Sequence, residues 1–321
     1  MLAAYASSID ERNPLNGLTV GDRPDPTVRE GWSRVTVKAA ALNHHDLWTL
    51  RGVGIRAEQL PMILGGDAAG VDENGNDVVV HSVICSPNWT GDDTLDPKRS
   101  LLSEVYDGTL AEQILVPTRN LVPKPATLSW QEAACLPTAW LTAYRMLFVK
   151  AALKPGDTVL VQGAGGGVST AAIALGSAAG YRMWATSRSE EKRKGALLLG
   201  ADAVFDTGER LPGKVDAVID NVGQATWAHS LRSLVPGGRI VTCGATTGPN
   251  PPSDLNRVFF LQLQVLGSTM GTREELVKLL DLLDTTGLRP TIDSELPLSR
   301  AATGLEKLAT GDVQGKIVVI P

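Results

Sequence analysis

The stretch DTVLVQGAGGGVSTAAIALGSAAG, residues Asp157–Gly180, decides the fold of this chain. An apolar run typical of a buried strand, Thr158–Gly163, enters a glycine cluster, and Val168–Ala179 then predicts a helix that ends at Gly180. Strand, glycine turn and helix in this order form the context in which a dinucleotide binds. The glycines let the backbone approach the pyrophosphate, and the helix N-terminus presents free N–H groups and the positive end of its dipole. We therefore predict a dinucleotide-binding turn, with cofactor contacts from Gly163, Gly166, Gly167 and Val168.

Two glycine spacings overlap in this turn. In the pattern GxGxxG the third position is Val168, which is a poor replacement for glycine. In the variant GxxGxxG the positions are Gly163, Gly166 and Ser169, and serine is small enough to preserve close packing of helix on strand. The alternative is a glycine-rich turn with a purely structural role.

The next predicted strand, Arg182–Ser187, ends at the position that distinguishes NAD from NADP. NAD-binding proteins usually carry Asp or Glu there, about 20 residues after the glycine turn, to bind the ribose 2′-hydroxyl. Here the strand ends at Ser187, and Arg188 and Lys192 follow, so a 2′-phosphate would meet positive charge and no carboxylate. We predict NADPH, bound in part by these three residues; the alternative is that the two cations are solvated charges at a helix start.

Strands and helices alternate with short connections through the middle of the chain, which predicts a doubly wound parallel sheet with helices on both faces. The first third instead contains strand-like runs separated by Gly and Pro, and such runs return near the C-terminus at Thr291–Leu298 and Lys316–Ile320. We therefore predict an α/β protein with two domains. The middle domain spans residues 123–285, and residues 1–122 and 286–321 together form the other.

Composition excludes several functional classes. The 321 residues are 43% hydrophobic and 20% charged, with a net charge of −5. There is no basic excess for nucleic acid, no apolar run of the roughly 18 residues that a membrane helix needs, and no signal-peptide pattern at Met1–Asp10. The three cysteines, Cys85, Cys135 and Cys243, lie far apart, without metal-ligand spacing. We expect a cytoplasmic protein that acts on a small molecule.

The chain resembles the medium-chain dehydrogenase/reductase superfamily, in its zinc-free, quinone-oxidoreductase-like branch. Motifs in the family's order cover nearly the whole chain; besides the glycine turn they include AALNHHDLWTLRG (Ala40–Gly52), PMILGGDAAGV (Pro61–Val71), DGTLAEQILVP (Asp107–Pro117), CLPTAWLTAYRML (Cys135–Leu147) and VDAVIDNVG (Val215–Gly223). The resemblance implies a GroES-like β-barrel catalytic domain, interrupted by a Rossmann domain that carries the doubly wound parallel sheet.

This sequence differs from its zinc-containing relatives at the positions of the metal ligands. The family's catalytic zinc is held by a Cys, a His in a GHE motif and a later Cys or Asp; the matching positions here are Asn43, Gly66 and Thr138. None of these is a good zinc ligand. The lobe that holds a structural zinc in relatives matches Ser86–Val105, and only Cys85 lies near it. We expect no bound metal.

Two residues are the candidates for catalysis. By the resemblance, Asn43 could hydrogen-bond the substrate oxygen or the nicotinamide ribose, or it could only cap a loop. His45 matches a position where relatives place a hydroxyl residue, and its imidazole could donate a proton. Asp67 is expected to be a structural acceptor for backbone N–H groups. Trp48 replaces a tyrosine that many zinc-free relatives carry, and an indole cannot deliver a proton.

The remaining cofactor contacts come from the resemblance and from the ends of the predicted strands: Thr138, Asn221, Gly244 and Lys316. For Lys316 the alternative is a solvated charge. His81 is expected to be a structural histidine with its hydrogen bonds satisfied.

These observations predict a zinc-independent, NADPH-dependent oxidoreductase that transfers hydride to a quinone or an α,β-unsaturated carbonyl compound, since conjugation makes hydride addition easier without a metal. The alternatives are an enoyl-thioester reductase and a catalytically idle NADPH-binding protein. The apolar run Gln264–Ser268 predicts an edge strand that, as in the family, would pair two copies into a homodimer.

Overall fold

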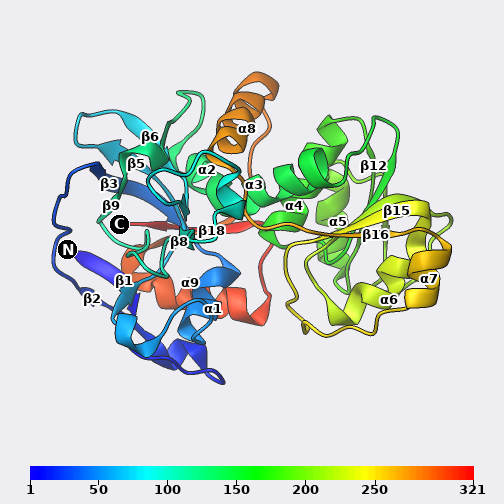
Figure 1. Ribbon diagram of the computed structural model, residues 1–321, viewed down its shortest axis with the longest axis horizontal. Helices are drawn as coiled ribbons and strands as arrows, with labels where there is room; N and C mark the ends of the chain where they lie inside the picture. Colours follow the sequence, from blue (N-terminus) through cyan, green and yellow to red (C-terminus); the bar gives the residue numbers. More distant parts are fainter. The chain divides into compact units, whose positions relative to one another are not determined.

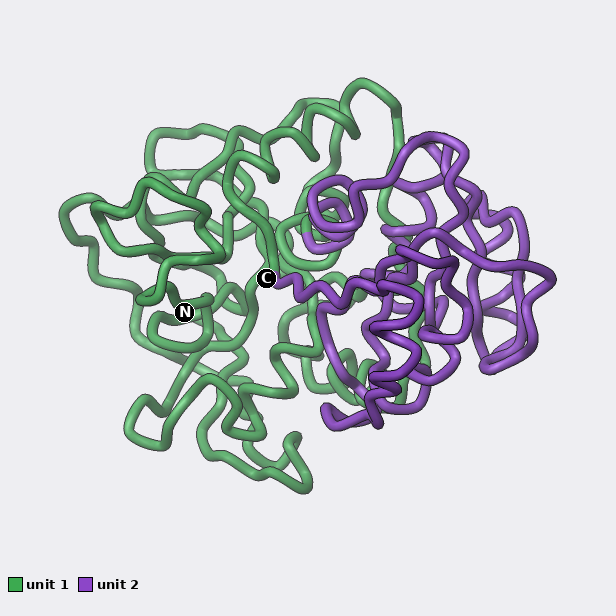
Figure 2. The backbone as a smooth tube through the Cα atoms, turned by 45° about the vertical axis from the view of Figure 1, so that its right-hand side comes forward, with its two compact units in different colours: residues 1–141, 270–321 green, residues 142–269 purple.

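A computed structural model describes residues 1–321 and divides them into two compact units. One unit comprises Met1–Leu141 and Met270–Pro321, and the other comprises Thr142–Thr269 (Figure 2). These bounds differ from the predicted domain boundaries, because helix α2 (Trp130–Ala134) packs on strands β3 and β5 of the first unit and α8 (Arg273–Thr286) contacts β10. Ser129 caps α2 in a capping box with Glu132, which is the structure that serine followed three residues later by glutamate favours.

The first unit is built on a seven-stranded sheet in the order β10-β6-β5-β3-β18-β17, with β9 paired to β3. Its strands are β3 (Trp32–Ala41), β5 (Asp67–Asp72), β6 (Asp77–Val80), β9 (Gln113–Pro117), β10 (Leu121–Pro123), β17 (Ile292–Pro297) and β18 (Lys316–Ile320). The last strand pairs antiparallel with β3, placing Val318 opposite Ala41. The C-terminal residues therefore return to the first unit, as predicted (Figure 1).

Shorter strands and two helices complete this unit. The strands are β1 (Leu2–Ala6), β2 (Leu18–Asp22), β4 (Met62–Ile63), β7 (Val83–Ile84) and β8 (Ser100–Leu101). Helices α1 (His44–Leu50) and α9 (Ala301–Thr310) pack on each other and contribute to one buried apolar core with the sheet. The sequence analysis did not predict either helix.

The second unit contains the predicted parallel sheet, in the order β13-β12-β11-β14-β15-β16. Its strands are β11 (Thr158–Val161), β12 (Arg182–Thr186), β13 (Ala203–Phe205), β14 (Val215–Asp220), β15 (Leu234–Thr242) and β16 (Gln264–Gly267). The helices are α4 (Gly167–Ala178), α5 (Glu190–Leu198), α6 (Gln224–Ser233) and α7 (Leu255–Phe260). Strand β16 is an edge strand, as the sequence predicts. Between α2 and β11 the chain forms π-helical turns, Leu136–Trp140 and Arg145–Lys150, on either side of α3 (Leu141–Tyr144).

One of the strand-like runs in the first third of the sequence is divided in the structure. The run Asp77–Ile84 forms β6 and β7, separated at His81 and Ser82. A residue distant in the sequence stabilises the division, since the side-chain amide of Asn120 donates 2.8 Å hydrogen bonds to the carbonyl oxygens of both His81 and Val83. None of the helices is both long and apolar enough to cross a bilayer.

Candidate functional site

Three side chains that are far apart in sequence form a buried polar cluster in the first unit. Lys316 begins β18, Asn43 follows β3 and precedes α1, and Asp67 begins β5. The Lys316 ammonium donates hydrogen bonds to Asn43 Oδ1 at 2.6 Å, to Leu42 O at 2.8 Å and to Asp67 Oδ2 at 3.0 Å. Lys316 is 3% exposed and Asp67 is fully buried, so the alternative of a solvated Lys316 is wrong.

The partners of Asn43 fix the orientation of its amide. Because the Lys316 ammonium can only donate, the atom that faces it is the amide oxygen. The amide nitrogen donates to Asp67 Oδ2 at 2.9 Å and to Ala41 O at 3.3 Å, which uses both of its hydrogens. Asn43 therefore has no spare donor for a substrate oxygen in this arrangement, although its oxygen retains one acceptor position.

Asp67 does not have the partners that the sequence suggested. We expected a carboxylate that accepts backbone N–H groups, and that expectation is wrong. Its Oδ2 accepts from the two side chains of the cluster, and its Oδ1 is buried without a hydrogen-bond partner. The backbone-accepting role belongs to Asp46, which binds the N–H groups of Asn43 and Gly65 at 2.8 and 2.9 Å. Burial raises the pKa of Asp46 to about 6, against the opposing effect of the Asn43 hydrogen bond.

The two adjacent histidines have different surroundings. His45 is bonded through both ring nitrogens, with Nε2 at 3.2 Å from Glu104 Oε1 and Nδ1 at 3.3 Å from Ser103 Oγ. His44 is exposed at the surface. Partial desolvation by the surrounding protein lowers the pKa of its imidazole, and the positive charges of Lys316 and Arg51 lower this pKa further. The predicted catalytic role of His45 stays a prediction, and its ring is held by the loop that carries Ser103 and Glu104.

Two hydroxyl groups lie beside Gly66, the glycine in the metal-ligand motif. A Cβ atom added at position 66 would lie 3.4 Å from Thr138 Oγ1 and 3.5 Å from Ser82 Oγ. The Ser82 hydroxyl is buried and donates to Gly66 O. Thr138, on the turn Leu136–Trp140, is partly exposed. The sequence analysis missed Ser82, because nothing local distinguishes it from other serines near strand ends.

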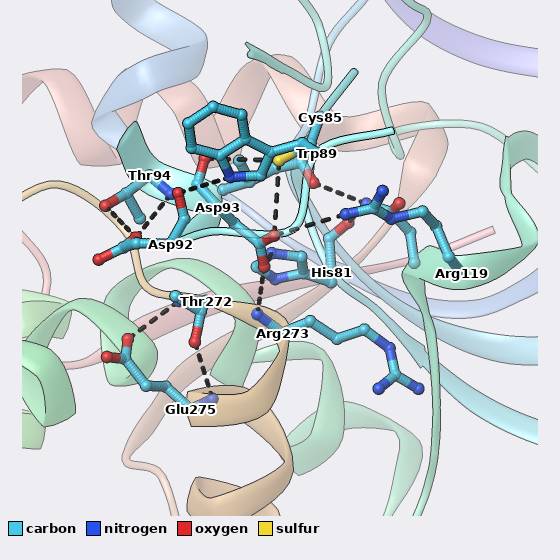
Figure 3. Close-up of polar contacts among 12 residues, drawn as sticks. His81, Cys85, Trp89, Asp92, Asp93, Thr94, Arg119, Thr272, Arg273 and Glu275 are labelled. Atoms are coloured by element: carbon cyan, nitrogen blue, oxygen red, sulfur yellow. Dashed lines mark hydrogen bonds and ion pairs between the residues drawn. The ribbon is translucent and has the colours of Figure 1, made fainter. Parts of the chain in front are cut away.

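A second polar cluster surrounds Asp93 in the loop that matches the family's structural-zinc lobe (Figure 3). Its carboxylate accepts the backbone N–H of Arg273 at 2.8 Å and lies 3.5 Å from Arg119 Nη2, 3.6 Å from His81 Nε2 and 3.5 Å from Cys85 Sγ. Burial opposes ionisation of Asp93, but the nearby His81 ring and the hydrogen bond from Arg273 N outweigh it and lower the pKa of Asp93 to about 2.

The other groups of this cluster are poor reactive centres. Burial raises the pKa of the Cys85 thiol to about 12 and lowers the pKa of His81. His81 is buried, but neither of its ring nitrogens has a hydrogen-bond partner within normal distance. The prediction that the hydrogen bonds of this histidine are satisfied is therefore wrong. Nowhere in the chain do three or more His, Cys, Asp or Glu side chains gather in a way that could hold a metal ion.

The glycine turn of the second unit has the backbone that a dinucleotide requires. Gly163 and Gly165 adopt φ values of +74° and +118°, a region that favours glycine. Gly166 caps α4, and a Cβ there would meet nothing within 4 Å, so the helix start is open. Ser169, in place of the third glycine, is buried and lies 3.4 Å from Asn221 Nδ2, which confirms that serine is tolerated in the packing.

The basic residues after β12 differ in whether they already have hydrogen-bond or ion-pair partners. Arg193 is bound to Ser187 O at 2.5 Å and to Asp206 at 2.8 Å. Arg188 is exposed and has no hydrogen-bond or ion-pair partner. The aliphatic part of Lys192 lies over the glycine turn, since a Cβ at Gly165 would be 2.5 Å from Lys192 Cδ. Arg188 is therefore free to receive an anion.

Two further predicted contacts lie at the carboxyl ends of the parallel strands. Asn221 follows β14 directly, and Gly244 follows β15 by two residues. Asp220, beside Asn221, is buried and accepts hydrogen bonds from Val222 N, Gly223 N, Thr226 and Ser230, which fixes this strand end. Thr138 belongs to the first unit and is described above.

Two family models match the chain. Residues 29–126 match the alcohol dehydrogenase GroES-like domain, and residues 167–285 match the zinc-binding dehydrogenase family. Among curated proteins, acryloyl-coenzyme A reductase of Metallosphaera sedula is 30% identical over 94% of this chain and 96% of its own length. Mouse quinone oxidoreductase is 29% identical over 89% of this chain and 88% of its own length.

Solved structures of other proteins have the same fold as this chain over both of its units. An NAD-dependent alcohol dehydrogenase superposes with a TM-score of 0.93 at 34% identity and covers all of both chains. The 2-octenoyl-CoA carboxylase reductase CinF, in complex with NADP and 2-octenoyl-CoA, has a TM-score of 0.90 at 25% identity, covering 99% of this chain and 87% of its own. The GroES-like domain and the Rossmann sheet predicted from the sequence are confirmed.

The buried ion pair yields a stability prediction. Lys316→Met keeps the length of the side chain but leaves the Asp67 carboxylate buried without its cation. We expect a loss of about 3–5 kcal/mol in the free energy of unfolding, measured by urea denaturation. The double variant Lys316→Met/Asp67→Asn removes both charges and should recover most of that loss. If Lys316→Met alone lowers the free energy of unfolding by less than about 1 kcal/mol, the ion pair is not important for stability.

Proposed function

The chain belongs to the medium-chain dehydrogenase/reductase superfamily, and from that premise we propose that it is a zinc-independent, NADPH-dependent reductase of quinones or α,β-unsaturated carbonyl compounds. The observation that carries the proposal is the buried Lys316 ammonium at Asn43. Asn43 matches the first of the three positions where zinc-containing relatives hold the metal, and here it binds the Lys316 ammonium instead. The dinucleotide turn has an open helix start at Gly166.

The residues do not fit a catalytic zinc ion. Zinc prefers thiolate, imidazole or carboxylate ligands, and a catalytic site supplies three of them. The matching positions here supply an amide, a glycine and a hydroxyl. The amide oxygen of Asn43 already accepts from an ammonium at 2.6 Å, so a divalent cation there would meet like charge. We therefore propose that catalysis proceeds without a metal.

The residues do fit NADPH. We propose that the turn Gly163–Gly167 receives the pyrophosphate at the start of α4, with Val168 beside it, and that Ser187, Arg188 and Lys192 receive the 2′-phosphate. Asn221, Gly244, Thr138 and Lys316 are the further contacts that we propose. Lys316 would act indirectly, since its three N–H donors are used within the cluster. The bound cofactor supplies the hydride.

A conjugated carbonyl is the substrate class that suits such a site. Hydride addition to its β-carbon moves electrons to the carbonyl oxygen, where hydrogen-bond donors can stabilise the charge without a metal. Among the relatives, quinone oxidoreductase and acryloyl-coenzyme A reductase are named for substrates of this kind. The acyl-CoA names favour a second candidate, reduction of an enoyl thioester, which uses the same chemistry on a longer substrate.

The substrate proposal is tested by NADPH oxidation. We expect turnover with 9,10-phenanthrenequinone and with a short enone, and the enone should be recovered as its saturated ketone. Crotonyl-CoA, measured alongside at equal concentration, distinguishes the second candidate, which a higher kcat/KM for the thioester would establish. Tight NADPH binding without turnover of any of the three would contradict both candidates and indicate an idle cofactor-binding protein.

The cofactor preference is tested at Arg188. Replacement by glutamine removes the charge that we assign to the 2′-phosphate, and a hydrogen bond to a charged group contributes about 1.5 kcal/mol. We expect Arg188→Gln to weaken NADPH binding roughly tenfold and to leave NADH binding unchanged. Arg182→Gln, which removes the same charge at the opposite end of β12, is the control. Equal use of NADH and NADPH by the wild type would contradict the assignment.

We also propose a homodimer formed through β16. This edge strand is mostly exposed, with Val265 47% exposed, and α7 nearby in sequence exposes Phe259 and Phe260 at 67% and 80%. Large exposed apolar side chains beside an unpaired strand edge favour pairing with a second copy.

Sedimentation velocity tests the dimer. At micromolar concentration the wild type should sediment as a dimer and Val265→Asp as a folded monomer, because a buried charge opposes edge pairing. Leu198→Asp, at an 89% exposed position on α5, should remain dimeric. A wild-type protein that is monomeric at this concentration would exclude the proposed interface.

A further inference from the structure

A buried network of five polar side chains lies in the second unit, outside the proposed contacts of the cofactor. Gln162 follows β11 and precedes the glycine turn, Thr186 ends β12, Asp220 ends β14, and His229 and Ser230 lie on α6. His229 is 7% exposed, and the other four residues are fully buried. Because water does not reach these groups, their hydrogen bonds must be made within the protein.

The hydrogen-bond directions in this network follow from Asp220. As a carboxylate it accepts and does not donate, and Ser230 Oγ donates to its Oδ2 at 2.8 Å. Having used its only hydrogen, the Ser230 hydroxyl must accept from the Gln162 amide, which lies at 3.1 Å. The group of Gln162 that faces α6 is therefore its NH₂. Its oxygen points the other way and accepts from Thr186 Oγ1 at 2.6 Å.

The same directions fix the protonation of His229. Gln162 Nε2 lies 2.9 Å from Nδ1 of the ring and can only donate, so Nδ1 must carry a lone pair. The other ring nitrogen, Nε2, lies 2.8 Å from the carbonyl oxygen of Glu209 and must carry the proton. The ring is therefore neutral, in the Nε2–H tautomer. A proton on Nδ1 would face the N–H groups of Gln162, and turning that amide over would break its bonds to Ser230 and Thr186.

The charges around the ring favour the same state. Desolvation lowers the pKa of the His229 imidazole, while its hydrogen bond to Glu209 O raises it. Arg232 on α6 lowers this pKa further, and Asp220 on β14 opposes that effect. The Glu209 carboxylate is directed to the backbone N–H of Asp206 at 2.7 Å. The ring therefore gains a second proton only as the pH falls below the usual histidine range, near 6.5.

Thr186 connects this network to the proposed cofactor site. Its hydroxyl oxygen accepts from Gly163 N at 3.4 Å, and its carbonyl oxygen accepts from Ala164 N at 2.7 Å. The end of β12 is thus bonded to the glycine turn through side chain and backbone. The next residue, Ser187, is one of the contacts that we propose for the 2′-phosphate. Thr186 therefore joins the segment proposed for the pyrophosphate to the segment proposed for the 2′-phosphate.

We propose that neutral His229 is a positioning residue for NADPH binding, which holds the end of β12 against the glycine turn through Gln162 and Thr186. The inference rests on the proposed function, since it assumes that the cofactor binds at this turn. When the ring is protonated, its Nδ1–H opposes the Gln162 amide, and the bond between Gln162 and Thr186 is lost. The two segments then lose their common support, and the cofactor binds more weakly.

Two variants at position 229 separate this role from simple packing. In His229→Gln the amide oxygen and nitrogen replace Nδ1 and Nε2, so the variant copies the neutral tautomer and cannot be protonated. His229→Leu is apolar and makes neither hydrogen bond. Isothermal titration calorimetry measures the dissociation constant for NADP⁺, which tolerates acid. The measurements run from about pH 8 to about pH 5, the range in which imidazole titrates.

We expect His229→Gln to bind NADP⁺ like the wild type at about pH 8, and His229→Leu to bind it about tenfold more weakly, as loss of a hydrogen bond predicts. At about pH 5 the wild type should bind about tenfold more weakly than His229→Gln. The 2′-phosphate also titrates near pH 6, but a comparison at equal pH removes that effect. Equal dissociation constants for wild type and His229→Gln at every pH would overturn the inference. Equal circular dichroism spectra exclude loss of folding as the cause of weaker binding.

Nitrogen NMR of the four histidines tests the ring without cofactor. In ¹⁵N-labelled protein, the signals of His229 are those that His229→Gln lacks. We expect the Nε2–H tautomer near neutral pH. We also expect NADP⁺ to lower the pH at which the ring gains its second proton, because coupling between two binding events is reciprocal.

An Nδ1–H tautomer or a charged ring near neutral pH would overturn the inference, even if the protein binds NADP⁺. A wild-type protein that binds no NADP⁺ at any pH would instead overturn the proposed function, and this inference with it.

Discussion

The first unit depends on one buried ammonium group. Lys316 Nζ connects the last strand, the segment between β3 and α1, and the first residue of β5 through three hydrogen bonds of 2.6–3.0 Å. A buried ion pair is costly to desolvate and tolerates few geometries, so its members must be held by the backbone around them. The antiparallel pairing of β18 and β5 with β3 supplies this constraint.

The same cluster defines what chemistry the proposed active site can perform. The Lys316 ammonium binds Asn43, which by resemblance matches a metal-ligand position of zinc-containing relatives, and its three N–H donors are all used by neighbouring groups. Without a free cation or a metal, the proposed site suits substrates whose developing charge is spread by conjugation. This is why we propose quinones, enones or enoyl thioesters rather than simple ketones, in agreement with the names of the relatives.

Local features of the sequence predicted much of the fold. The glycine turn, the capping box at Ser129 and the alternation of strands and helices each depend on neighbouring residues, and the structure confirms all three. The partners of Lys316 could not be predicted in this way, because 273 residues separate it from Asn43. The sequence therefore allowed a solvated lysine and a backbone-accepting Asp67, and only the pairing of strands distant in the chain excludes both. The division of one strand at His81 depends likewise on the distant Asn120.

We propose that hydride transfer needs no metal, since the Asn43 amide oxygen already accepts a hydrogen bond from the Lys316 ammonium. The metal content of purified, active protein tests it most directly, with activity measured before and after dialysis against a strong zinc chelator. We expect far less than one zinc per chain and undiminished turnover after dialysis. One tightly bound zinc per chain, with activity lost on its removal and restored on its return, would contradict it.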